Sequence, residues 1–101
     1  MELVVADNPD KSRYEVTAGG ELAGFINYHL SEHGIAFTHA ETDPRFRGKG
    51  IAGRLVQSVL DDAAARGLAV LPFCPYVRGW LAEHAEYVKL VPEDRRAEFG
   101  L

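Results

Sequence analysis

One segment in the middle of the chain constrains its fold most: positions 45–53 read Arg-Phe-Arg-Gly-Lys-Gly-Ile-Ala-Gly. Its glycines lie where an extended run gives way to an amphipathic helix, and glycine tolerates positive φ and the close approach of a ligand. A helix that begins there points several unpaired N–H groups at one place, and its dipole favours negative charge. Two arginines and a lysine surround that place. The segment therefore predicts a pocket for phosphate, and most of all for a pyrophosphate.

Length and composition bound the rest of the interpretation. The 101 residues predict a single domain that spans positions 1–101. A hydrophobic fraction of 47% with 26% charged residues is typical of a globular protein and excludes a disordered or fibrous chain. No stretch approaches the roughly 18 consecutive apolar residues of a membrane span, so we expect no membrane partner. The net charge of −4 argues against a nucleic-acid partner and is compatible with a cationic acceptor such as an amine.

The chain has one cysteine, Cys74, which excludes an intrachain disulfide. The first residues show no basic start followed by a long apolar core, so no signal peptide is visible. Together these features predict a cytoplasmic, reducing location. The four histidines have neither the spacing nor the clustering of a zinc site, so no metal is expected. The oligomeric state stays open between a monomer and a weak homodimer formed through an exposed sheet edge.

The first half of the chain predicts an antiparallel meander. Extended runs cover residues 2–6, 12–18, 22–30 and 35–42, and turn-forming residues separate them. Gly19-Gly20 is a two-residue hairpin signal, and Pro44 helps to end the fourth run.

The second half changes to a helical period. Apolar residues from Ile51 onward form one stripe of a helix that Gly67 stops. Residues 68–71 predict a short fifth strand, parallel to the fourth. Pro75 begins a second helix, residues 87–91 look like a final strand, and residues 92–101 predict one or two helical turns. The fold class is therefore α+β, with a mixed sheet of five or six strands, a parallel pair at its centre and two main helices.

Two familiar phosphate-binding motifs match this segment only in part, because the surrounding sequence lacks the features that each motif requires. Gly48, Gly50 and Gly53 match the dinucleotide fingerprint, but that motif follows the first strand of a parallel unit and needs an acidic residue about 20 positions further on. Here antiparallel strands come first, and residues 70–74 contain no acid. A P-loop needs serine or threonine after Gly-Lys, whereas Lys49 is followed by glycine.

A third context fits. Arg45-x-x-Gly48-x-Gly50, after a meander and before a short parallel strand, resembles motif A of the GNAT superfamily of acyl-CoA-dependent N-acyltransferases. The resemblance covers about residues 14–91. It implies a minimal GNAT fold whose fourth and fifth strands splay apart around the pantetheine arm, with amides from Phe46 to Ala52 holding the pyrophosphate of coenzyme A. The implied cofactor-binding residues are Thr42, Arg45, Phe46, Arg47, Gly48, Lys49, Gly50, Ile51 and Ala52, with Arg54 as a further phosphate partner.

A closer resemblance is to very small, single-domain GNAT-like proteins that carry a cysteine after the fifth strand and a tyrosine soon after it. Here that segment reads Cys74-Pro75-Tyr76, and His39-Ala40-Glu41-Thr42 is similar to the His-Thr-Glu of that group. Full-length GNAT enzymes place two helices between the first and second strands, where this chain has only a turn. Their absence predicts an open acceptor face.

Cys74 has two interpretations. It precedes a helix N-terminus, whose dipole favours a thiolate, and Arg78 adds positive charge if it points back. The resemblance places it near the end of pantetheine, where it takes the acyl group as a thioester or only packs there as a small hydrophobe.

Three further side chains are candidates for proton transfer. Glu41 and His39 are two residues apart on one face of the fourth strand, together with Ile35 and Phe37. A part-buried Glu41 there has a raised proton affinity and is a candidate base, with His39 as a second candidate, and the alternative is a salt-bridged or solvated strand residue. Tyr76 is the candidate acid that protonates the leaving thiolate. Two alternatives stay open: Tyr76 only packs in the core, or Tyr87 is the acid instead.

The predicted activity is acetyl transfer from acetyl-CoA to an amine, carried by a small molecule or by a protein or peptide lysine. Two alternatives stay open at this point. The chain is a module that binds CoA or acyl-CoA without catalysis, or an interaction domain whose glycine turn binds another nucleotide.

Overall fold

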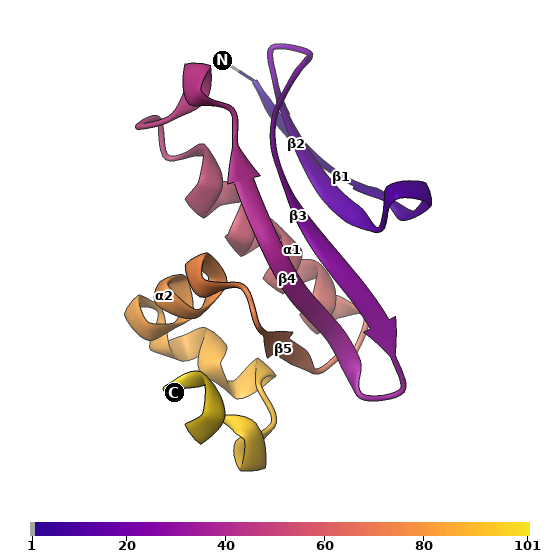
Figure 1. Ribbon diagram of the computed structural model, residues 1–101, viewed down its shortest axis with the longest axis vertical. Coiled ribbons are helices and arrows are strands. Elements are labelled where there is room, and N and C mark those ends of the chain that lie inside the picture. Colours follow the sequence, from indigo (N-terminus) through magenta and orange to yellow (C-terminus); the bar gives the residue numbers. More distant parts are fainter. Residues whose placement is uncertain (1) are drawn as a thin grey trace.

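The structure is a computed structural model that describes residues 2–101. Its strands form one sheet in the order β1-β2-β3-β4-β5, in which β1 to β4 are an antiparallel meander and β5 runs parallel to β4. The strands are β1 (Leu3–Asn8), β2 (Arg13–Ala18), β3 (Glu21–Ser31), β4 (Gly34–Thr42) and β5 (Val70–Pro72). The α+β class, the meander and the parallel pair are confirmed, but the pair lies at the edge of the sheet and not at its centre (Figure 1).

Two helices follow the meander. Helix α1 (Ile51–Ala65) lies across one face of the sheet, and α2 (Pro75–Glu83) lies beyond the β5 edge (Figure 1). The predicted stop at Gly67 is confirmed: its φ is 69°, and its N–H and that of Leu68 donate to the carbonyls of Ala64 and Ala63. These two bonds form a Schellman motif. Neither helix has the length and apolar character that crossing a bilayer would require, within the described residues.

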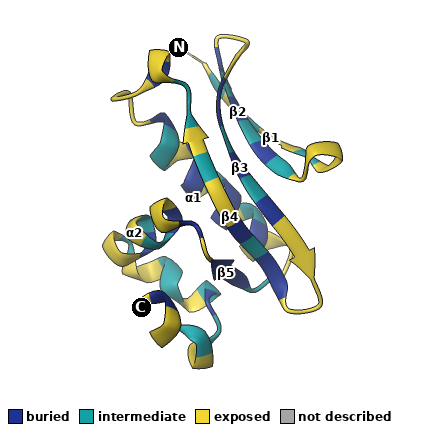
Figure 2. Ribbon diagram, in the orientation of Figure 1, coloured by how far each residue is buried: buried dark blue, intermediate teal, exposed yellow. Residues whose placement is uncertain are grey.

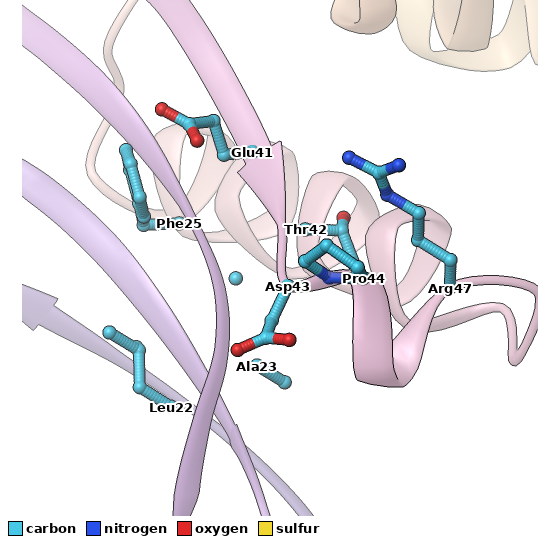
Figure 3. Close-up of a pocket in the computed structure, with 9 residues that line it drawn as sticks. Leu22, Ala23, Phe25, Glu41, Thr42, Asp43, Pro44 and Arg47 are labelled. Atoms are coloured by element: carbon cyan, nitrogen blue, oxygen red, sulfur yellow. The ribbon is translucent and has the colours of Figure 1, made fainter.

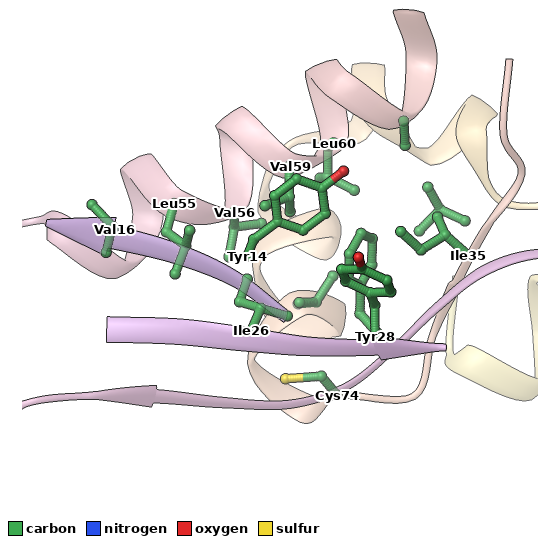
Figure 4. Close-up of a cluster of buried hydrophobic side chains, with 14 of the residues drawn as sticks. Tyr14, Val16, Ile26, Tyr28, Ile35, Leu55, Val56, Val59, Leu60 and Cys74 are labelled. Atoms are coloured by element: carbon green, nitrogen blue, oxygen red, sulfur yellow. The ribbon is translucent and has the colours of Figure 1, made fainter. Parts of the chain in front are cut away.

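The core lies between α1 and the sheet. Figure 4 shows Tyr14, Val16 and Ile26 of the strands facing the apolar stripe of α1. The stripe consists of Ile51, Leu55, Val56, Val59, Leu60 and Ala63, all buried as the helical spacing predicts. Among residues 2–101 no helix covers the opposite face of the sheet, the open face, which bears half-buried side chains on β2 and exposed ones near the end of β4 (Figure 2).

The predicted final strand over residues 87–91 is wrong. Ala85–Leu90 form a 3-10 helix instead, whereas the tail contains the expected helical turns at Glu93–Arg95 and Ala97–Phe99. Tyr87 packs edge-on against Trp80, with the ring centroids 5.0 Å apart, and its hydroxyl donates to Asp61. An alternating pattern makes a strand only beside a partner edge, and this segment packs on the helices instead.

A β-bulge in β4 changes the face on which its last residues lie. Asn27 pairs with His39 and Tyr28 with Phe37, so Thr38 is an extra residue. One inserted residue moves every following side chain to the other face. Ile35 and Phe37 are therefore buried under α1, while His39 and Glu41 lie on the open face, and the prediction that all four share a face is wrong.

Gly34 begins β4 where the chain has no room for a side chain. Its φ is +127°, and a Cβ there would lie 2.3 Å from the Ala69 carbonyl oxygen. We expect Gly34→Ala to lower the free energy of unfolding by about 3 kcal/mol or more, because backbone strain and the clash act together. Gly20→Ala, at φ +86° in open space, is the matched control and should cost about 1 kcal/mol. Equal losses in urea titrations would contradict this explanation.

Two core tyrosines predict how stability depends on alkaline pH. Burial and a hydrogen bond to Asp7 raise the pKa of Tyr28 to about 12, and burial and a bond to Asp62 raise the pKa of Tyr14 further. The unfolded chain loses these protons at about pH 10, whereas the folded chain retains them. Stability is therefore full below pH 10 and falls as pH rises toward 12. Phenolate absorbance should appear for these residues only as circular dichroism reports unfolding; ionisation of all four tyrosines near pH 10 in folded protein would contradict it.

Candidate functional site

The parallel strands part soon after they pair. β4 and β5 are in register only from Ile35 and Val70 to Phe37 and Pro72, after which β4 continues alone to Thr42. The Cys74 N–H donates to the Phe37 carbonyl at 2.8 Å and closes the apex of the gap.

The free stretch of β4 presents backbone polar groups to this gap. The Asp43 N–H donates to Ala23 of β3, so in a strand of period two the neighbouring Thr42 and Ala40 face the other way. Their N–H and C=O groups have the gap beside them where β5 would continue. The predicted splaying of the two strands is therefore confirmed.

The glycine turn joins β4 to α1 and ends in a row of free amides. Gly48 and Gly50 have φ of 79° and 73°, and Gly50 is the N-cap of the helix. The first helical hydrogen bond runs from the Arg54 N–H to the Gly50 carbonyl. The amides of Gly48 to Gly53 consequently have no hydrogen-bond partner among residues 2–101. A helix start of this kind binds anions.

The predicted range of amides needs a correction at both ends. The N–H groups of Phe46 and Arg47 already donate to the carbonyls of Asp43 and Pro44, because Pro44–Phe46 form a 3-10 turn. These two amides are therefore not available to a ligand. Gly53 was missed: as the third residue of the helix it has a free N–H, which counting three positions from the N-cap would have found.

A pocket of about 470 Å³ lies between the free end of β4, the glycine turn and α2. Tyr76, which is 47% exposed, lines it opposite the turn, and Phe46 anchors the turn by its buried ring. The remaining lining comes from Ala40, Glu41, Thr42, Arg47, Gly48, Gly50, Ile51, Ala52 and Gly53. Most of the predicted cofactor-binding residues are therefore brought together in one hollow.

Not all of the basic side chains predicted to bind phosphate lie at this pocket. Arg47 lines the pocket. Arg45 instead pairs with Asp43 at 3.1 Å, an interaction that lowers the pKa of the Asp43 carboxyl and raises that of the guanidinium. Arg54 lines a separate hollow beside β1, and Lys49 lies outside the pocket lining that the described residues form.

The candidate base lies on the open face. The Glu41 Oε2 atom lies 2.9 Å from the His39 Nε2 atom and accepts a hydrogen bond from it, and the Glu41 and His39 side chains are 60% and 56% exposed. The expectation of a part-buried Glu41 among apolar residues is therefore wrong, and the bulge at Thr38 is the reason. Figure 3 shows Glu41, Asp43 and Arg47 around a second hollow of about 350 Å³, which shares Glu41, Thr42 and Arg47 with the first.

Cys74 is at the apex of the gap but covered. It is 2% exposed and caps the N-terminus of α2, and its side chain belongs to the core. Arg78 does point back, because its guanidinium donates to the Phe73 carbonyl at 2.8 Å. Tyr87 is held away from the gap by Asp61, which raises the pKa of its hydroxyl.

The splayed pair and the glycine turn on a mixed sheet define a GNAT-type fold. Residues 13–90 match the model of a family described as GCN5-related N-acetyl-transferase, and the chain belongs to this family. Such proteins are acyltransferases that generally take the acyl group from acetyl-CoA. A comparison with curated proteins found no match.

Proposed function

We propose that the chain is an acetyl-CoA-dependent N-acetyltransferase that acts on a primary amine. The observation that carries this proposal is the row of free amides from Gly48 to Gly53, at the mouth of a gap that β4 lines with unpaired backbone groups. A diphosphate fits the amides, and Arg47 adds positive charge. The glycine positions leave room for this approach, since a Cβ at Gly48 or Gly50 would meet nothing within 4 Å.

The donor arm then extends from the turn toward the apex. The amides of pantetheine pair with the backbone of Ala40 and Thr42, as an added strand would. Tyr76 covers the arm from the α2 side. The thioester reaches the level of the bulge, where an N–H of β4 polarises its carbonyl as an oxyanion hole does.

The acceptor amine approaches from the open face of the sheet. The His39–Glu41 pair takes the proton of the ammonium group, and the neutral nitrogen attacks the thioester carbonyl. A C–N bond forms, the C–S bond breaks, and the CoA thiolate takes a proton from the Tyr76 hydroxyl. The new amide nitrogen loses its remaining extra proton to water, and the Tyr76 phenolate regains one from water, so the net proton released is the one that the His39–Glu41 pair took from the ammonium group. The products are an amide and free CoA.

We further propose that the acceptor is a lysine of a protein or peptide. The face that bears His39 and Glu41 is a sheet surface without a covering helix in residues 2–101, and enclosed small molecules need a deeper cavity. A long side chain on a macromolecule reaches the apex from such a surface. The net charge of −4 favours a basic partner.

Transfer is proposed to be direct, without an acyl group on Cys74. A nucleophilic thiol must be accessible, and Cys74 is 2% exposed. We expect Cys74→Ala to keep turnover within about threefold of the wild type, with any loss caused by the small cavity. Intact-mass spectrometry after mixing with acetyl-CoA should show no added acetyl group. An acetylated wild type together with an inactive Cys74→Ala would establish the thioester relay instead.

One observation favours a second candidate, a module that binds acyl-CoA without catalysis: both side chains of the His39–Glu41 pair are more than half exposed to solvent. Release of free thiol from acetyl-CoA separates the two. We expect release above the buffer rate with lysine peptides, and less with polyamines and small amines. Tight binding of acetyl-CoA without thiol release would support the binding module. Binding of ATP or NAD but not of CoA would overturn both the enzyme and the acyl-CoA-binding module.

A further inference from the structure

We propose that the free edge of β1 pairs with the β1 edge of a second copy, so that the two sheets become one continuous sheet around a two-fold axis at Val5. This inference is independent of the proposed activity. β1 is the outermost strand, opposite the β4–β5 gap, so the pairing leaves both pockets open (Figure 1).

The register of β1 shows which groups are free. The Gly19 N–H donates to the Glu2 carbonyl, so residues 2, 4, 6 and 8 face β2. Leu3, Val5 and Asp7 therefore present their N–H and C=O groups outward. Antiparallel pairing of Val5 with Val5 of the second copy places Leu3 opposite Asp7. The outward N–H and C=O groups of all three residues on each edge then have hydrogen-bond partners.

β1 has few of the features that keep an edge strand unpaired, and its one charged residue, Asp7, accepts a hydrogen bond from the buried Tyr28 hydroxyl. Its sequence, Leu-Val-Val-Ala-Asp-Asn, contains no lysine, arginine, proline or glycine, and its pairing with β2 has no bulge. Such features are the usual protection of an exposed edge. Val4, on the open face and 48% exposed, would gain Ala6 of the second copy as a neighbour.

The helix beside this edge is complementary to itself in the same register. Arg54, Ser58 and Asp62 follow one another at intervals of four along α1, and they line a hollow of about 390 Å³ together with Leu3, Val5, Ala6, Asp7 and Tyr14. β1 and α1 are both antiparallel to β4, so they run in the same direction. Tyr14 pairs with Asp7 and its hydroxyl donates to Asp62, so Asp62 is level with Asp7. Two residues of strand and four of helix each advance about 6 Å, so Ser58 is level with Val5.

A two-fold axis at Val5 consequently sets the two α1 helices antiparallel across the joined hollows. Arg54 of one copy then faces the Asp62 side of the other, and Ser58 faces Ser58. Arg54 forms no ion pair or side-chain hydrogen bond within residues 2–101, so its charge is free for this partner. Asp62 accepts from Tyr14 and lies 3.5 Å from Arg66 through the same Oδ2 atom, so Arg54 of the second copy would approach its other carboxylate oxygen. A second copy is therefore the occupant that matches both the edge and the charges.

Sedimentation of the full chain should show reversible association to twice the 11.1 kDa protomer mass between micromolar and millimolar concentration. Val5→Pro removes an outward N–H without touching the β1–β2 ladder, and should weaken association about tenfold or more while circular dichroism stays native. A protein that remains monomeric at millimolar concentration, or a folded Val5→Pro that associates like the wild type, would overturn the proposal.

Cross-linking tests the register without relying on a destabilising variant. In a Cys74→Ser background, Val5→Cys places two thiols on the axis, where paired Cα atoms lie about 5.5 Å apart and within disulfide range. Val4→Cys is the matched control, because it lies opposite residue 6 and not opposite itself. We expect rapid disulfide formation for Val5→Cys only. Efficient cross-linking of Val4→Cys with none for Val5→Cys would overturn this interface.

Discussion

Ala52→Glu should abolish CoA binding and stabilise the fold at the same time. Ala52 is the second residue of α1 and lines the pocket. A carboxylate in the first helical turn favours the helix dipole, so we expect a gain of about 0.5 kcal/mol in the free energy of unfolding. The same charge repels a diphosphate from the free amides, and affinity for CoA should fall about 100-fold or more.

Ala52→Gln is the matched control for size. It adds the same bulk without the charge, so it should lose much less affinity than Ala52→Glu. The single tryptophan, Trp80, lies next to Gly53, where a Cβ would be 3.8 Å from its Nε1, so its fluorescence can report binding. If both variants bind CoA like the wild type, the anion is held elsewhere. If both lose binding equally, the loss is steric, which would contradict the predicted effect of the charge.

Glu41→Gln should separate chemistry from donor binding. The substitution keeps the size of the side chain but removes the charge that, with His39, is proposed to take the proton of the amine. We expect kcat/KM for a lysine peptide to fall about 100-fold, the usual contribution of a general base. The affinity for acetyl-CoA should change little, because Glu41 lies at the β4 rim of the pocket with an exposed side chain and is not among the free amides proposed to hold the diphosphate.

The pH profile of the same variant gives a second readout. In Glu41→Gln the rate should rise only as the free amine becomes available at higher pH, because the proposed acceptor of the ammonium proton has been removed. Asp43→Asn, which alters a carboxylate of the neighbouring hollow that is paired with Arg45, is the matched control and should retain activity. Full activity in Glu41→Gln would show that the pair is not the base.

Much of the fold could be predicted from local patterns. The helix from Ile51, its stop at Gly67 and the meander follow from periodicity and turn residues, which act over a few positions. The strand predicted over residues 87–91 failed because alternation does not say whether a partner edge exists. Tyr87 instead packs against Trp80 and donates a hydrogen bond to Asp61, and no local sequence pattern indicates either contact.

The site was predicted less completely, for two physical reasons. The bulge at Thr38 has no glycine to mark it, yet it decides that Glu41 faces solvent. The 3-10 turn over Pro44–Phe46 occupies two amides of the expected range and directs Arg45 toward Asp43. In contrast, the glycine turn itself could be located from sequence, because positive φ and a helix start are local requirements.

The most direct test of the account is an amide NMR titration of the full chain with CoA. Chemical shifts of the Gly48 to Gly53 amides should move most and should move with CoA and with ADP but not with pantetheine, because the diphosphate is the group they bind. The Phe46 and Arg47 amides, already bonded within the protein, should move less. Saturable binding of CoA that leaves the Gly48 to Gly53 amides unshifted would contradict the central claim.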